Sequence, residues 1–183
     1  MLKRIGNIAL MIIRRRTLSG EYLEGSTEGS SQYSSKPFVM PFGGLPTKAL
    51  QNKVLKQGGF GADARYKLFL TKKKSLWVYI PGGYKTIRED AGKSTGKATL
   101  SWSGRLMRNL GIIATAPLEV TLGFRNAEEE QKAQWHNTMG AGKSKVIRKF
   151  MGLTDKEVEE IEKIIGANVR SNVEKLLEKA TLT

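Results

Sequence analysis

The sequence has no cysteine among its 183 residues. This absence excludes a disulfide framework, a thiolate metal site and a cysteine nucleophile. A single histidine, His136, also excludes a metal site built from several histidines. The acidic residues do not form the pairs that are typical of a glycosidase or a carboxylate metal site. We therefore predict no catalytic residue, no metal and no cofactor, and we do not expect an enzyme.

The sequence also lacks an apolar run long enough to cross a bilayer. The N-terminal segment MLKRIGNIALMIIRRR has some features of a signal peptide, but its apolar part, residues 8–13, is short. Arginines 14–16 follow that part, where small residues would precede a cleavage site. We therefore expect neither an export signal nor a membrane partner, and binding to a membrane surface is the minor alternative for this segment.

Acidic residues are few relative to basic ones. The chain has 31 Lys and Arg against 17 Asp and Glu, a formal net charge of +14, which indicates an anionic partner. No helix-turn-helix, zinc finger, RNP aromatic pair or KH loop is recognisable. The charge therefore favours non-specific contact with double-stranded DNA over base reading. The candidate DNA or partner contacts are Arg14, Arg15, Arg16, Lys72, Lys73, Lys74, Lys143 and Lys145.

The segment HNTMGAGKSK, residues 136–145, contains the end of a phosphate-binding loop. Its Gly-Lys-Ser triplet, residues 142–144, matches the last part of G-x-x-x-x-G-K-[ST], but Asn137 stands where the leading glycine is required. A helix is expected before this loop, whereas a phosphate-binding loop follows a strand. These departures argue against nucleotide binding. The lone histidine beside Trp135 is interpreted as a packed or helix-capping residue.

The patterns that are present alternate between helix and strand. Apolar residues recur every three or four positions in residues 2–16 and again from Leu153 onward, which predicts an N-terminal amphipathic helix and a C-terminal helix. Thr154 and Glu157 form a capping-box pattern at the start of the second helix. Other helices are predicted at residues 47–57 (with Thr47 as the cap), 103–110 and 127–139. Strands are predicted at residues 64–71, 75–81, 97–102, from residue 111, and at 117–124.

Residues 64–71 and 75–81 are predicted to form a hairpin with Lys72, Lys73 and Lys74 at its tip. A lysine tip is usually solvated, and a phosphate-facing role is the alternative. The fold class is α+β, with a mostly antiparallel β-sheet packed with helices.

The predicted organisation has two parts. Residues 1–45 hold the N-terminal helix and a flexible Ser/Gly-rich arm, and residues 46–183 form an α+β core domain with the C-terminal helix. The N-terminal helix is expected to dock on its own domain or on a neighbouring subunit.

Four blocks follow one another between about residues 80 and 165: GYKTIREDAGK, ATLSWSGRLMRNLGI, VTLGFRNAEEEQKAQWHNTMG and VIRKFMGLTDKEVEEIEKII. In order and spacing they resemble the virion morphogenesis family of tailed bacteriophages, which includes head–tail joining and tail-completion proteins. The second block is similar to L-x-x-[ST]-G-x-L-x-x-[SN]-[IL]. The last block is similar to P-x-R-x-F-[LM]-G-L-[ST]-x-x-[DE], although Val146 stands where the family often has the proline.

The resemblance implies a non-enzymatic virion protein of the neck or tail, assembled in the cytoplasm of the bacterial host. Such tail-completion or tail-terminator proteins form homo-oligomeric rings, commonly hexamers, that join the head connector to the tail around the DNA conduit. Their partners are other neck, connector or tail-tube proteins. Within the last block, Arg148, Phe150 and Gly152 are candidates for an interface, and a core turn is the equal alternative. Gly152 is expected to take a positive φ.

The alternative function is a free nucleic-acid-binding protein without sequence specificity, which uses the net charge of +14. The two hypotheses differ in where the protein is found. A neck subunit is part of a ring and of the phage particle. A free binding protein is a monomer that is absent from particles.

Overall fold

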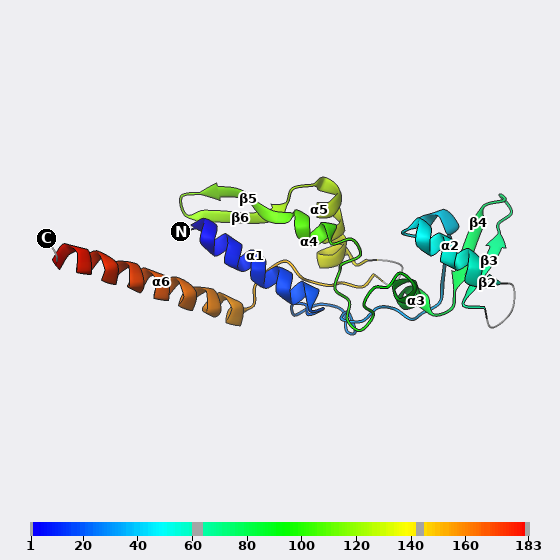
Figure 1. Cartoon of the computed structure of the whole chain (residues 1–183), viewed down its shortest axis with the longest axis horizontal. Coiled ribbons are helices and arrows are strands. Elements are labelled where there is room, and N and C mark those ends of the chain that lie inside the picture. Colours follow the sequence, from blue (N-terminus) through cyan, green and yellow to red (C-terminus); the bar gives the residue numbers. More distant parts are fainter. Residues whose placement is uncertain (1, 60–63, 142–144, 182–183) are drawn as a thin grey trace. The chain divides into compact units, whose positions relative to one another are not determined.

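The chain folds into two compact units, shown in a computed structural model that describes residues 2–59, 64–141 and 145–181 (Figure 1). Unit 1 contains residues 1–31 and 99–183, and unit 2 contains residues 32–98. The boundary predicted at residue 45 lies inside unit 2, because the N-terminal helix shares a core with the C-terminal half of the chain. The class is α+β, as predicted.

Unit 1 is built around its N-terminal helix. Its elements are α1 (Leu2–Leu18), α4 (Arg105–Asn109), β5 (Leu110–Ala116), β6 (Glu119–Phe124), α5 (Ala127–Gln134), the π-helical turn Trp135–Met139 and α6 (Asp155–Thr181). Strands β5 and β6 form an antiparallel hairpin with a register shift at Ile112. A Cβ added at Gly6 of α1 would lie 2.9 Å from Val120 Cγ2 and 3.0 Å from Ile112 Cδ1, so the glycine lets α1 approach the hairpin closely.

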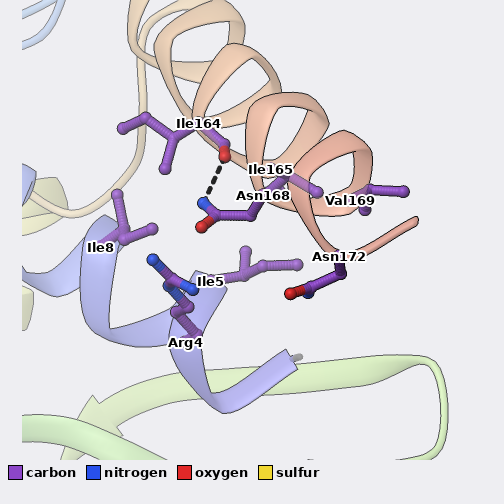
Figure 2. A pocket seen from close by; sticks show the side chains of 8 residues that line it. All are labelled: Arg4, Ile5, Ile8, Ile164, Ile165, Asn168, Val169 and Asn172. Carbon is purple, nitrogen blue, oxygen red and sulfur yellow. Dashed lines mark hydrogen bonds between the residues drawn. The ribbon is translucent and has the colours of Figure 1, made fainter. Parts of the chain in front are cut away.

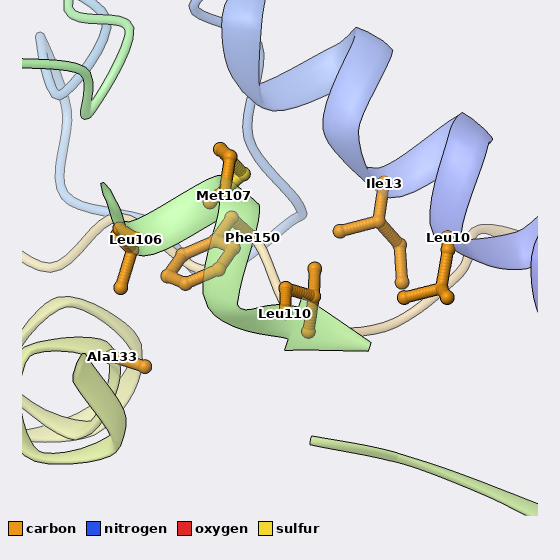
Figure 3. Packing of buried hydrophobic residues seen from close by; sticks show 7 residues of the cluster. All are labelled: Leu10, Ile13, Leu106, Met107, Leu110, Ala133 and Phe150. Atoms are coloured by element: carbon orange, nitrogen blue, oxygen red, sulfur yellow. The ribbon is translucent and has the colours of Figure 1, made fainter. Parts of the chain in front are cut away.

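The core of unit 1 joins α1 to α4, β5 and α5 (Figure 3). Phe150 is fully buried there and meets Phe124 edge to face, with ring centroids 6.4 Å apart. The buried members of this cluster are Leu10, Ile13, Leu106, Met107, Leu110, Ala133 and Phe150. A second cluster, formed by Ala9, Ile12 and Ile161, joins α1 to α6. The N-terminal helix therefore docks on its own unit, through two apolar sides.

The Ser/Gly-rich segment after α1 is irregular, but its first part is held in place. The backbone N–H of Leu23 donates to Lys149 O at 2.7 Å, and that of Thr27 donates to Ile147 O at 3.0 Å. In return, Ile147 N donates to Thr27 Oγ1 and Lys149 N donates to Ser26 Oγ, both at 2.9 Å. Short hydroxyl side chains satisfy backbone groups of a distant segment, so this part of the arm belongs to the fold of unit 1.

Unit 2 is a small sheet with two helices. Its elements are β1 (Phe38–Pro41), the 3₁₀ turn Phe42–Gly44, α2 (Lys48–Gln57), β2 (Gly58–Gly59), β3 (Tyr66–Leu70), β4 (Leu76–Ile80) and α3 (Gly83–Asp90). The strand order is β1-β4-β3-β2, and only the short β2 runs parallel to its neighbour. The hairpin of β3 and β4 confirms the prediction, and Thr47 caps α2 by accepting from Leu50 N at 3.2 Å.

One carboxylate ties both helices of unit 2 to the same face of the sheet. Asp90, at the end of α3, accepts from Lys53 Nζ of α2 at 2.8 Å, from Arg65 Nε at 2.8 Å and from the Tyr66 hydroxyl of β3. Burial alone raises the pKa of Asp90, but the hydrogen bonds from Arg65, Lys53 and Tyr66 outweigh it and lower that pKa to about 2.

The predicted strand at residues 97–102 is wrong. These residues form bends in the segment that leads from unit 2 back to unit 1. Leu100 has a left-handed backbone (φ 48°), and its side chain packs against the core of unit 1. Among the described residues this segment is part of neither sheet, and the propensity of single residues such as Thr99 and Trp102 for strands does not by itself make a strand.

A buried arginine joins the end of the first helix to the start of the last helix and the turn before it, more than 130 residues further along the chain. Arg16, in the last turn of α1, donates to Phe150 O at 2.8 Å, to Gly152 O at 2.9 Å and to the carboxylate of Glu157. Glu157 also accepts from Thr154 N at 2.8 Å, while its own N–H donates to Thr154 Oγ1, so the predicted capping box is confirmed. Gly152 has φ 132°, as expected.

Replacing Arg16 by methionine is expected to lower the free energy of unfolding of unit 1 by about 3 kcal/mol, because Glu157 and two carbonyls lose a buried partner. The matched control is Arg15→Met. Arg15 is 68% exposed and lies 3.9 Å from Glu160, so its loss is expected to cost less than about 0.5 kcal/mol. Urea unfolding followed by far-ultraviolet circular dichroism measures both variants. Equal effects would contradict the structural role given to Arg16.

Candidate assembly and nucleic-acid interfaces

The arginine triplet at the end of α1 is divided between the core and the surface. Arg14 donates from Nε to Met107 O at 3.1 Å and from Nη2 to Leu110 O. The Arg16 guanidinium is buried as described above. Both side chains therefore hold α1 to its own unit, and Arg15 is the member of the triplet that faces solvent.

Three lysines form the tip of the β3–β4 hairpin, as predicted. The turn is closed by hydrogen bonds from Lys74 N to Thr71 O at 2.8 Å and from Thr71 N to Ser75 O at 3.0 Å. Lys74 adopts a left-handed backbone with φ 56°. Lys72, Lys73 and Lys74 are all exposed. Their charges are therefore available to an anionic partner.

Of the two lysines predicted in the GAGKSK loop, Lys145 is among the described residues. Lys143 lies outside the described residues. Lys145 is exposed and has a left-handed backbone with φ 47°. It stands next to the Ala141–Val146 bridge that closes the loop. Lys145 is thus an exposed cation of unit 1.

The candidate interface residues Arg148, Phe150 and Gly152 lie on one extended segment that serves the core of unit 1. Arg148 Nε donates to Ser30 O at 2.7 Å, Phe150 is buried, and Gly152 O accepts from Arg16. The core-turn interpretation accounts for these contacts. Their role in an interface stays a prediction.

Asn137, at the position where a phosphate-binding loop requires glycine, has a structural role. Its side-chain oxygen accepts from Phe150 N at 2.9 Å and from Met151 N at 3.0 Å, and its Nδ2 donates to Ala133 O at 2.8 Å. This role was not predicted from the sequence. An amide residue at the end of a helix often accepts from backbone N–H groups, but the segment that Asn137 meets lies thirteen residues further along the chain.

His136 lies beside this contact in the π-helical turn. Its Nδ1 is buried and has no hydrogen-bond partner among the residues that the structure describes, and its backbone oxygen accepts from Arg148 N at 2.6 Å. Burial first, and then the charge of Arg148, lower the pKa of His136 to about 4. The side chain is therefore neutral and packed near pH 7, in agreement with its interpretation as a packed residue.

The positive charge is concentrated in unit 2. Its 67 residues contain thirteen Lys and Arg against three Asp and Glu, a net charge of +10. The 116 residues of unit 1 contain eighteen against fourteen, a net charge of +4. Two acids of unit 2, Glu89 and Asp90, already pair with Arg65. Unit 2 therefore has most of the net positive charge of the chain.

Unit 1 exposes apolar surface on helix α6 and on the β5–β6 hairpin. An open groove of about 260 Å³ lies between α1 and α6 (Figure 2). Beyond Ile5 of α1, the apolar stripe of α6 continues through Val169 and Val173, which are 44% and 48% exposed. Leu118, at the tip of the β5–β6 hairpin, is 94% exposed. The groove is lined by Arg4, Ile5, Ile8, Ile164, Ile165, Asn168, Val169 and Asn172.

Comparisons of the chain with protein-family models, with curated proteins and with solved structures find no match. In the described part of the chain, no helix combines the length and apolar character needed to span a membrane. The same part contains no cluster of three or more His, Cys, Asp or Glu side chains able to bind a metal ion.

His136 makes the stability of unit 1 depend on pH. Between its ordinary pKa of 6.5 and its folded pKa of about 4, the unfolded chain binds a proton that the folded chain does not. Stability is therefore expected to fall as the pH drops through this window. His136→Leu should reduce the difference in free energy of unfolding between pH 7 and pH 5 by roughly 1–2 kcal/mol. Urea unfolding at both pH values measures this, and an unchanged difference would exclude His136 as the cause.

Proposed function

We propose that the chain is a structural subunit of the neck of a tailed phage, a tail-completion or tail-terminator protein that joins the head connector to the tail. It acts as part of a homo-oligomeric ring, commonly a hexamer, around the DNA conduit, and it is located in the virion. The resemblance of residues 80–165 to virion morphogenesis proteins suggests this class. The observation that carries the proposal is the apolar surface on the projecting elements of unit 1.

The geometry of α6 supports an assembling subunit. Its 27 residues extend about 40 Å, whereas the 17 residues of α1 extend about 26 Å. The apolar stripe of α6 therefore continues past the end of α1, at Val173. A stripe of this kind on a folded unit is typical of a surface that a partner covers. Ring closure requires two different surfaces on each subunit, and the β5–β6 hairpin with exposed Ile113 and Leu118 offers the second.

A second candidate function is non-specific nucleic-acid binding by a free protein. The observation that favours it is the net charge of +10 on the 67 residues of unit 2. The two functions are compatible in one chain, since a ring around DNA also needs weak contacts that ignore sequence. The neck function requires that the protein assembles and is present in phage particles, whereas the free nucleic-acid-binding function requires neither.

Val173→Asp is expected to disrupt ring assembly without unfolding the subunit, because it places a charge on an exposed apolar stripe. The concentration required for ring formation should rise by about tenfold or more. Ala167→Asp, on the exposed polar side of the same helix, is the matched control and should leave assembly unchanged. Native mass spectrometry and negative-stain electron microscopy of the purified protein measure both variants.

A wild-type protein that is a monomer in solution and is also absent from purified phage particles would contradict the proposed function. Equal behaviour of the Val173 and Ala167 variants in a ring-forming protein would place the interface elsewhere.

A further inference from the structure

The sheet of unit 2 has one covered face and one face with aromatic side chains. Tyr66, Val78 and Ile80 share one face of the sheet and are fully buried, and the Tyr66 hydroxyl donates there to Asp90 of α3. The intervening positions of the same strands therefore point to the opposite face. On β3 and β4 these positions are Lys67, Phe69, Trp77 and Tyr79, which we call the outer face.

The residues of the outer face are paired across the two strands. Phe69 stands opposite Trp77, and Lys67 stands opposite Tyr79. Lys67 Nζ lies 6.0 Å from the centroid of the Tyr79 ring, which places both side chains on one face. Phe69 is 39% exposed, and the other three side chains are half-buried. The outward face of an antiparallel sheet usually carries polar residues, so three aromatic rings here indicate a ligand-binding surface.

The charge around the outer face indicates the kind of ligand. The pair Leu70–Leu76 follows the pair Phe69–Trp77 and ends the two strands. The tip that contains Lys72, Lys73 and Lys74 comes directly after it. The unit as a whole has a net charge of +10. An aromatic surface within a strongly basic unit favours a ligand with both flat apolar rings and negative charges, and a nucleic acid with exposed bases meets both requirements.

We propose that the outer face binds single-stranded nucleic acid. Bases stack on Phe69, Trp77 and Tyr79, while Lys67 and the three tip lysines contact the phosphates. A duplex keeps its bases stacked inside the helix, so it meets the lysines but not the rings. This proposal goes beyond the neck function, because it concerns unit 2 alone and does not require ring formation.

The test measures the fluorescence anisotropy of a labelled 20-nucleotide oligothymidine and of a duplex of equal length, each titrated with the full-length protein. The single strand is expected to bind about tenfold more tightly than the duplex. Phe69→Ala should weaken binding of the single strand by about tenfold and leave duplex binding unchanged. Replacement of Lys72, Lys73 and Lys74 by alanine should weaken both. Leu55→Ala is the matched control, since Leu55 is a 50% exposed apolar residue on α2 of the same unit.

Circular dichroism establishes that each variant is folded. Equal affinity for both nucleic acids, together with no effect of Phe69→Ala, would overturn the proposal in favour of contact through charge alone. Absence of binding to either nucleic acid would also overturn it, and would leave a protein partner as the occupant of the outer face. Neither result depends on whether the Val173→Asp variant assembles, so the two proposals fail independently.

Discussion

Unit 1 depends on the buried guanidinium of Arg16. This side chain donates to the carbonyls of Phe150 and Gly152 and to the carboxylate that caps α6. It therefore fixes the start of the last helix, the turn before it and the end of the first helix relative to one another. A buried cation requires all of its partners to be in place, because an unpaired charge in the core is costly. The apolar clusters on both sides of α1 contain residues of the same segments that these contacts hold together.

The two units differ in their net charge and in the surfaces that they expose. Unit 1 has nearly balanced charge and exposes apolar stripes, which suits contact with other subunits or neck proteins. Unit 2 has most of the net charge and an aromatic outer face, which suits contact with nucleic acid. Most of the net charge belongs to unit 2, whereas the apolar surfaces proposed to join subunits belong to unit 1.

Features set by neighbouring residues were predictable from the sequence. The caps at Thr47 and Thr154, the β3–β4 hairpin and the amphipathic α1 depend on residues a few positions apart, and all are present. Features set by distant partners were not. Arg14 meets residues more than ninety positions away, and the concentration of charge is visible only once residues 32–98 are known to fold together. The predicted strand at residues 97–102 was wrong, because a strand forms only as part of a sheet and local sequence does not show whether a segment joins one.

We propose that nucleic acid contacts unit 2 and that unit 1 makes the protein contacts. Ultraviolet cross-linking of the full-length protein to oligothymidine, followed by mass spectrometry of the linked peptides, tests it most directly. We expect cross-links within residues 64–81, at the aromatic rings of the outer face and beside the tip lysines. Cross-links confined to unit 1, at Arg15 or near Lys145, would contradict it.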